Sequence, residues 1–127
     1  MIKLYFPVSP VAKSRPRMTR RGHVYTPQKT KDFEEEIKYI AMMYMHMNGH
    51  KPLEEALIVR AYFFIKKPKK PKHKQPIGRP DIDNLQKSLF DALNGVVWKD
   101  DSQICLSYCR KIYSEVPSIT LFVSEDT

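Results

Sequence analysis

The chain has 127 residues, of which 42% are apolar, and it carries a formal net charge of +8. This length fits one domain with a modest core, and the apolar fraction argues against disorder over most of the chain. No apolar run approaches the roughly 18 residues that a membrane span requires. Residues 1–6 run straight into strand-like sequence, so we expect a cytoplasmic protein without a signal peptide. Its two cysteines are expected to be reduced thiols rather than zinc ligands.

The first half of the chain predicts one strand and one long helix. Residues 2–8 predict a strand, residues 13–22 a basic loop, and residues 23–25 a short extended piece. Thr26 and Pro27 suit a helix start, with a hydroxyl at the N-cap and proline at the first helical position. Gly49 is typical of a left-handed helix end. The expected apolar stripe consists of Phe33, Ile37, Ile40, Tyr44 and Met47, and Met42, Met43 and Met45 are also expected to fill the core.

The second half predicts a strand, a loop, a helix and two more strands. Residues 57–65 are β-branched and aromatic, whereas the lysines and prolines of residues 66–74 predict a mobile basic loop. Residues 83–94 predict a helix with Asp83, Lys87 and Asp91 on its polar side, and strands are expected at 103–113 and 118–123. This order predicts an α+β two-layer sandwich, in which helices pack on one face of a mixed β-sheet.

Two pairs of aspartates stand out against the basic background. Asp81 and Asp83 lie two positions apart at the entrance of the second predicted helix, and residues two apart in an extended segment point the same way. Asp100 and Asp101 follow a tight return through Gly95, so the chain can bring them back beside the first pair. Clustered carboxylates raise one another's pKa values unless a cation compensates, and oxygen ligands suit Mg²⁺ or Mn²⁺ rather than zinc.

The same residues also have plainer explanations. Asp83 could serve only as the N-cap of its helix, and Asp100 with Asp101 could form only a turn. Lys87 lies one turn after Asp83, where spacing alone favours a surface ion pair with Asp83 or Asp91. Beside a bound metal that activates water at a phosphodiester, Lys87 would instead aim its charge at the scissile phosphate. The histidines have no spacing that suits a histidine-based mechanism.

Three segments carry a resemblance to a known family. They are Arg79-Pro80-Asp81-Ile82-Asp83-Asn84-Leu85-Gln86-Lys87, Phe90-Asp91-Ala92-Leu93-Asn94-Gly95 and Trp98-Lys99-Asp100-Asp101-Ser102-Gln103-Ile104. Together they resemble the signature of RusA-type Holliday junction resolvases, which are bacterial, often prophage-encoded, endodeoxyribonucleases. Two further segments, Lys13-Ser14-Arg15-Pro16-Arg17 and Tyr25-Thr26-Pro27, are similar to the N-terminal part of that family. The resemblance therefore spans most of the chain.

The resemblance implies a Mg²⁺-dependent crossover junction endodeoxyribonuclease of DNA recombination and repair, with Mn²⁺ able to substitute for Mg²⁺. It implies that Asp81, Asp83 and Asp101 are catalytic metal ligands and that Lys87 assists catalysis. Within the adjacent pair it favours Asp101 over Asp100 as the ligand. It also implies a homodimer, and the substrate supplies an independent argument, because a four-way junction has near two-fold symmetry and must be cut on two strands.

The basic residues are expected to line the path of the DNA. They are Lys13, Arg15, Arg17, Arg20, Arg21, Lys66, Lys67, Lys69, Lys70 and Arg79. Residues 1–31 and 66–80 contain no Asp or Glu, and such a one-sided field attracts polyanions, although it could also serve solubility alone. Two alternative functions stay open: a nuclease for flaps or other branched DNA, and a DNA-binding protein without catalysis.

Overall fold

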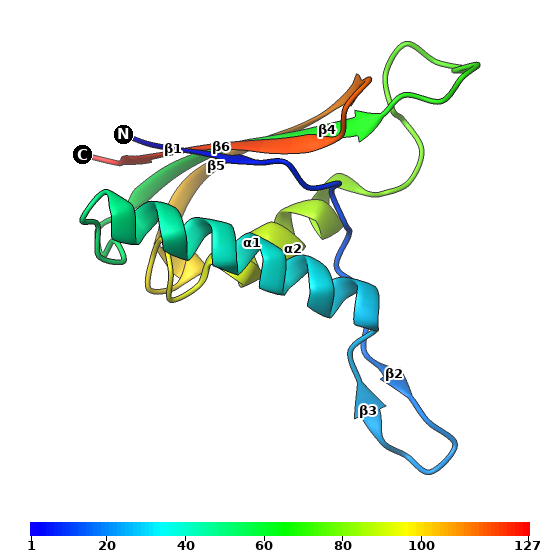
Figure 1. The fold of residues 1–127 in the computed structure, drawn as a ribbon, viewed down its shortest axis with the longest axis horizontal. Coiled ribbons are helices and arrows are strands. Elements are labelled where there is room, and N and C mark those ends of the chain that lie inside the picture. The colour runs from blue at the N-terminus through cyan, green and yellow to red at the C-terminus, as the bar shows by residue number, and fades with distance from the viewer.

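The computed structural model describes residues 1–127 and consists of two helices, a four-stranded sheet and a small separate hairpin (Figure 1). Neither helix combines the length and the apolarity that crossing a membrane requires. The elements in chain order are β1 (Ile2–Phe6), β2 (Arg17–Met18), β3 (Val24–Tyr25), α1 (Gln28–Met47), β4 (Leu57–Lys66), α2 (Ile82–Leu93), a 3₁₀ turn (Asp101–Gln103), β5 (Ile104–Ser114) and β6 (Ser118–Glu125).

The strands of the main sheet follow the order β1-β6-β4-β5. β6 is antiparallel to both β1 and β4, whereas β4 and β5 run parallel, so the sheet is mixed. Side chains alternate between the two faces of each strand, and on β4 the buried series is Leu57, Val59, Ala61 and Phe63. Figure 1 shows both helices on one side of this sheet. The predicted α+β architecture, with helices on one face of a mixed sheet, is therefore confirmed.

The helix α1 packs on the sheet through a narrower stripe than predicted. Its buried residues are Thr30, Phe33, Ile37, Ala41 and Met45. Ile40 and Tyr44 pack only partly against the core, and Met47 is 75% exposed. Met42 and Met43 are exposed as well, so the prediction that the methionines fill the core is right for Met45 alone. A helix advances 100° per residue, so residues three or four apart share one face, and the buried residues from Thr30 to Met45 follow this spacing.

The ends of α1 test the predicted caps. The N-cap is Pro27 rather than Thr26, and no side chain caps this end. Thr26 precedes the cap by one residue, so its hydroxyl lies outside the position from which it was predicted to accept. At the other end Gly49 has a φ of +68°, which confirms the predicted left-handed helix end.

Part of the predicted basic loop is a two-stranded hairpin. Arg17 pairs with Tyr25 and Met18 with Val24, and Gly22 closes the turn with a φ of +83°. Figure 1 shows this hairpin projecting away from the sheet and the helices. The segment after β4 has no regular secondary structure, as predicted, and its lysines are exposed.

Candidate active site

The entrance of α2 positions the first pair of aspartates. Asp81 is the N-cap residue, with an extended backbone, and its carbonyl oxygen accepts the N–H of Leu85 at 3.1 Å. Its carboxylate makes no capping hydrogen bond. Asp83 lies inside the first turn of the helix rather than at its N-cap, and it accepts only the adjacent N–H of Asn84 at 2.9 Å. The explanation of Asp83 as a simple helix cap therefore does not hold.

The return path from α2 to β5 positions the second pair. Gly95 turns the chain with a φ of +79°, and its N–H donates to the carbonyl oxygen of Trp98 at 2.7 Å. The indole of Trp98 is fully buried, packs edge-on against Phe90 and donates from Nε1 to Oδ1 of Asn94 at 2.7 Å. The backbone of Leu53 makes two hydrogen bonds with this segment: its carbonyl oxygen accepts the N–H of Lys99, and its N–H donates to the carbonyl oxygen of Val97. The path to Asp101 is thus fixed by packing and backbone hydrogen bonds.

Asp83, Lys87 and Asp101 line one open pocket of about 300 Å³ between α2 and the start of β5. Gln86 and Ser107 add an amide and a hydroxyl to the same lining. The structure therefore brings together three of the residues predicted from the sequence to act in catalysis. The polar side-chain atoms of the lining residues are oxygens, apart from the nitrogens of Lys87 and of the Gln86 amide, and oxygens are the ligands that Mg²⁺ prefers.

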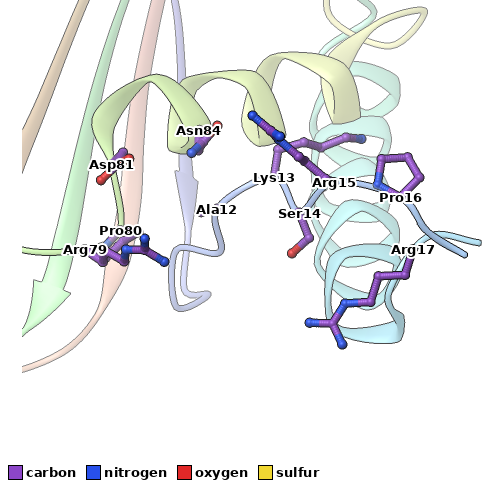
Figure 2. A pocket seen from close by; sticks show the side chains of 10 residues that line it. All are labelled: Ala12, Lys13, Ser14, Arg15, Pro16, Arg17, Arg79, Pro80, Asp81 and Asn84. Atoms are coloured by element: carbon purple, nitrogen blue, oxygen red, sulfur yellow. The ribbon is translucent and has the colours of Figure 1, made fainter.

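Asp81 lines a different pocket of about 650 Å³, which shares no lining residue with the first. Figure 2 shows it beside Arg79 at the end of this pocket where α2 begins. In this structure no three Asp, Glu, His or Cys side chains gather closely enough to hold a metal ion. The assignment of Asp81, Asp83 and Asp101 to one metal site stays a prediction.

The neighbouring acid Asp100 already makes hydrogen bonds within the protein. Asp100 accepts the N–H of Ser102 at 3.1 Å, while its own N–H donates to Oε1 of Gln103 at 2.9 Å, which forms a capping box at the 3₁₀ turn. Hydrogen bonds from Ser102 lower the pKa of the Asp100 carboxyl below its usual value. The turn-forming role that we considered for both residues thus describes Asp100. The side chain of Asp101 makes no such bond and lines the pocket with Asp83.

Lys87 forms an ion pair with Asp91, at 3.6 Å between Nζ and Oδ2, and its side chain is 63% exposed. The surface ion pair that spacing alone favoured is therefore present. None of the ion pairs in the structure includes Asp81, Asp83 or Asp101, although the chain is rich in lysine and arginine. These three carboxylates are the acids around the start of α2 and β5 that remain available to a cation.

Lys13 connects the N-terminal segment with both helices. Its Nζ lies 2.5 Å from Oε1 of Glu34 and 3.5 Å from Oδ2 of Asp91, and its backbone N–H donates to the carbonyl oxygen of Asn84 at 2.9 Å. Burial lowers the pKa of Lys13, but the hydrogen bonds and charges of Glu34 and Asp91 outweigh burial, so this pKa is raised. Figure 2 shows the side chain directed toward α1. In this structure the predicted DNA-binding Lys13 bonds within the protein.

The other predicted DNA-binding residues fall into three groups. Arg15, Arg17 and Arg79 line the larger pocket, where Asp81 is the one acidic residue (Figure 2). Arg20 and Arg21 lie in the turn of the hairpin. Lys66 ends β4 and donates to the carbonyl oxygen of Glu115 at 2.6 Å, while Lys67, Lys69 and Lys70 follow it and are exposed.

Two residues that support the site, Lys111 and Gln103, were not identified from the sequence. Lys111 on β5 donates to the carbonyl oxygens of Gly78 at 2.8 Å and of Pro80 at 2.9 Å, directly before Asp81. Gln103 fastens the 3₁₀ turn by donating from Nε2 to the carbonyl oxygens of Leu53 and Glu55. The available signal for Lys111 was a lysine on the side of a strand that faces the helices, because a cation there needs acceptors from the protein.

Both cysteines lie on β5 and are free thiols. Cys105 is exposed, whereas Cys109 faces α2 and donates from Sγ to Oε1 of Gln86 at 3.2 Å. Burial raises the pKa of the Cys109 thiol to about 11, so at neutral pH it stays protonated and able to donate.

The chain is similar to a known protein family and to a bacterial relative. The family model described as "Endodeoxyribonuclease RusA" matches residues 7–124, which include both helices and both pairs of aspartates. The uncharacterized protein YqaN of Bacillus subtilis (strain 168) is similar to this chain, with 29% identity over 136 aligned positions that cover 91% of this chain and 90% of YqaN.

Proposed function

The chain belongs to the RusA family of endodeoxyribonucleases, and from this premise we propose that it is a Mg²⁺-dependent endonuclease that resolves four-way DNA junctions. The observation that supports this most is the set of unpaired carboxylates at the start of α2 and β5 in a strongly basic chain. Without a cation such a set would repel the phosphates of DNA, and with one it would attract them.

We propose that Asp83 and Asp101, together with Asp81, hold Mg²⁺, for which Mn²⁺ can substitute. When bound, the metal supplies Lewis-acid activation of the phosphodiester and of the attacking water. Lys87 lines the same pocket as Asp83 and Asp101, and its exposed ammonium can exchange Asp91 for the scissile phosphate at little cost, since exposed ion pairs contribute about 0–1 kcal/mol. Arg15 and Arg79 would bind phosphates that flank the scissile bond.

We propose further that the active form is a homodimer that makes paired nicks in DNA recombination and repair, in the cytoplasm at the nucleoid. One chain offers one set of unpaired carboxylates, whereas a junction with near two-fold symmetry must be cut on two strands. Two copies related by a two-fold axis would present two such sets to matching strands.

The replacement Asp83→Asn tests the catalytic assignment. On a synthetic mobile four-way junction with Mg²⁺ we expect wild-type protein to make symmetric paired nicks, and the variant to be slower by at least about 100-fold. Binding of the junction in EDTA should be retained, because Asp83 forms no ion pair or hydrogen bond with the basic residues of the predicted DNA path. Asp32→Asn, which changes an exposed acid on α1, is the matched control. Undiminished cleavage by Asp83→Asn would contradict the assignment.

A thermal-shift titration tests the metal site without any cleavage. A ligand that binds only the folded state stabilises it by mass action, so Mn²⁺ or Mg²⁺ should raise the melting temperature of the wild type. Asp83→Asn and Asp101→Asn should lose this increase, and Asp100→Asn should keep it, because the carboxylate of Asp100 already caps the 3₁₀ turn. An equal shift in all four proteins would contradict the site.

The substrate assignment is tested by comparing a four-way junction, a flap and a linear duplex. Preferential cutting of the flap would replace junction resolution with the alternative nuclease function. Junction binding in EDTA without any cutting after Mg²⁺ or Mn²⁺ is added would instead favour a DNA-binding protein without catalysis. The expected result is cutting of the junction above both other substrates.

A further inference from the structure

The helices cover one face of the main sheet and leave the other uncovered (Figure 1). We call this second surface the open face. It consists of the even-numbered residues of β4 and β6, the even-numbered residues of β5 from Leu106 onward, and Lys3 and Tyr5 of β1. The opposite face carries the buried odd-numbered residues, which are Leu57, Val59, Ala61 and Phe63 of β4 and Ile119, Leu121 and Val123 of β6.

Aromatic rings form a continuous row across three strands of the open face. The ring of Tyr62 on β4 packs edge-on against Phe122 on β6, with 6.1 Å between centroids, and lies 5.9 Å from the ring of Tyr108 on β5. Tyr108 is 45% exposed, and Tyr62 and Phe122 are only partly buried. An exposed row of aromatic rings on a sheet is an apolar surface that binding partners commonly use.

The charges of the open face are all positive. Lys3, Arg60 and Arg110 are exposed there, form no ion pair, and lie among the aromatic rings; Nζ of Lys3 is 5.6 Å from the centroid of Phe122. No Asp or Glu belongs to this face. A second copy of the chain packed on it about a two-fold axis would bring these cations near one another without acids to compensate them. The charge is complementary to a polyanion instead.

We propose that the open face binds single-stranded DNA, with bases stacked on Tyr62, Tyr108 and Phe122 and phosphates held by Arg60, Arg110 and Lys3. A four-stranded sheet that presents aromatic rings on one face and packs helices on the other is a suitable platform for unpaired bases. Stacking tolerates any base, since every base has a flat aromatic face, so little sequence preference is expected. The proposal rests on the proposed function only in the choice of DNA as the nucleic acid.

This surface is separate from the candidate active site. Asp83 and Lys87 belong to α2, which packs on the opposite face of the sheet. Single strands occur where branched DNA opens, so the open face would hold an unpaired arm or end while duplex phosphates lie against the other side of the protein.

The test measures binding of a labelled oligothymidylate by fluorescence anisotropy in EDTA. The oligonucleotide has about 20 nucleotides, which exceeds the length that one single-strand-binding domain covers. We expect Tyr62→Ala with Tyr108→Ala to weaken binding by about 10-fold or more and to leave binding of a blunt duplex within about twofold. Tyr39→Ala, which removes an exposed tyrosine of α1, is the matched control and should bind as the wild type does. The double replacement of the same tyrosines by Phe keeps the rings and should retain binding.

Three results would overturn the proposal. In the first, the wild type does not bind the oligonucleotide. In the second, the alanine variant keeps its fold by circular dichroism and binds as tightly as the wild type. A third is an alanine variant that sediments as a monomer where the wild type is a dimer, because the open face would then hold a second copy. Since the assay needs no metal and no cleavage, failure of junction resolution would leave its outcome unaffected.

Discussion

Nζ of Lys111 lies 2.9 Å from the carbonyl oxygen of Pro80, the residue that precedes Asp81. The same ammonium also binds the carbonyl oxygen of Gly78. Strand β5 therefore holds the turn from which α2 begins, and the start of α2 carries Asp81 and Asp83. We therefore expect Lys111 to act as a positioning residue, which affects the candidate active site through the backbone.

Replacing Lys111 by Met should loosen this turn and lower the cleavage rate by about 10-fold, while the affinity for the junction in EDTA changes little. Hydrogen bonds to a charged group are worth about 1.5–3 kcal/mol when their partners are left unsatisfied, so a loss of stability of about 1–2 kcal/mol is expected at this partly exposed site. The Mg²⁺ concentration at half-maximal rate should rise, which a purely structural role would not require.

The matched control for Lys111 is Lys99→Met, which removes an exposed ion pair with Glu54. Lys111→Arg should restore part of the cleavage rate, because guanidinium can also donate to two carbonyl oxygens. An unchanged Mg²⁺ dependence in Lys111→Met would show that the turn keeps its position without the lysine.

Asp100 and Asp101 are adjacent but should respond differently to replacement by Asn. Asp101→Asn is expected to abolish metal-dependent cleavage and to change the melting temperature little. Asp100→Asn should lower the melting temperature, because the amide is a weaker acceptor for Ser102, and should leave most of the cleavage. The reverse pattern would assign Asp100 as the ligand.

The acid dependence of stability provides a further check on Asp100. Its pKa is lower in the folded state than the ordinary value of 3.8. Its contribution to stability is therefore present above that value and is lost as the pH falls through the lowered pKa. Equilibrium unfolding should show a difference between wild type and Asp100→Asn near neutral pH that disappears in strong acid.

Lys13 gives a prediction at the opposite end of the pH scale. Because its pKa is raised above 10.5 in the folded state, its contribution is fully present below that pH and is lost as the pH rises through the folded pKa. Lys13→Met should cost about 1 kcal/mol in unfolding free energy at about pH 8. The difference from the wild type should shrink as the pH rises through the folded pKa; a constant difference would mean that packing of the lysine stem dominates.

The two thiols should differ in reactivity. The thiolate is the reactive form, and burial raises the pKa of Cys109 to about 11. At about pH 8, iodoacetamide should alkylate the exposed Cys105 and leave Cys109 unmodified until the protein unfolds. Mass spectrometry of tryptic peptides measures this directly, with Cys105→Ser as the control. Equal labelling of both residues would show that α2 separates readily from β5.

Secondary structure was largely predictable, because each element buries one regular series of side chains. The β-branched and aromatic run at residues 57–65 and the three- and four-residue spacing from Phe33 to Met47 identified a strand and a helix within a few residues of their observed bounds. Strand order was not predictable in this way. β5 and β6 are joined by a short turn around Pro117, yet β4 lies between them. An alternating burial pattern is the same whichever strand lies alongside.

The candidate site was partly predictable for a related reason. The short path through Gly95 and Trp98 indicated that Asp101 returns toward Asp83, and both line one pocket. In an extended segment Asp81 and Asp83 would point the same way. Asp83 instead lies within the first helical turn, and Asp81 lines another pocket. Lys13 could not be assigned from the sequence, since its partner Glu34 lies on α1.

The position of β6 has a consequence for how the protein is made. This strand is the last along the chain, yet it hydrogen-bonds to both β1 and β4 and so fills the middle of the sheet. During translation the earlier strands emerge with a gap between them, and the helices have no finished surface to cover until residues 118–125 have left the ribosome. The sheet on which both helices pack is therefore complete only after the chain has been synthesised through β6.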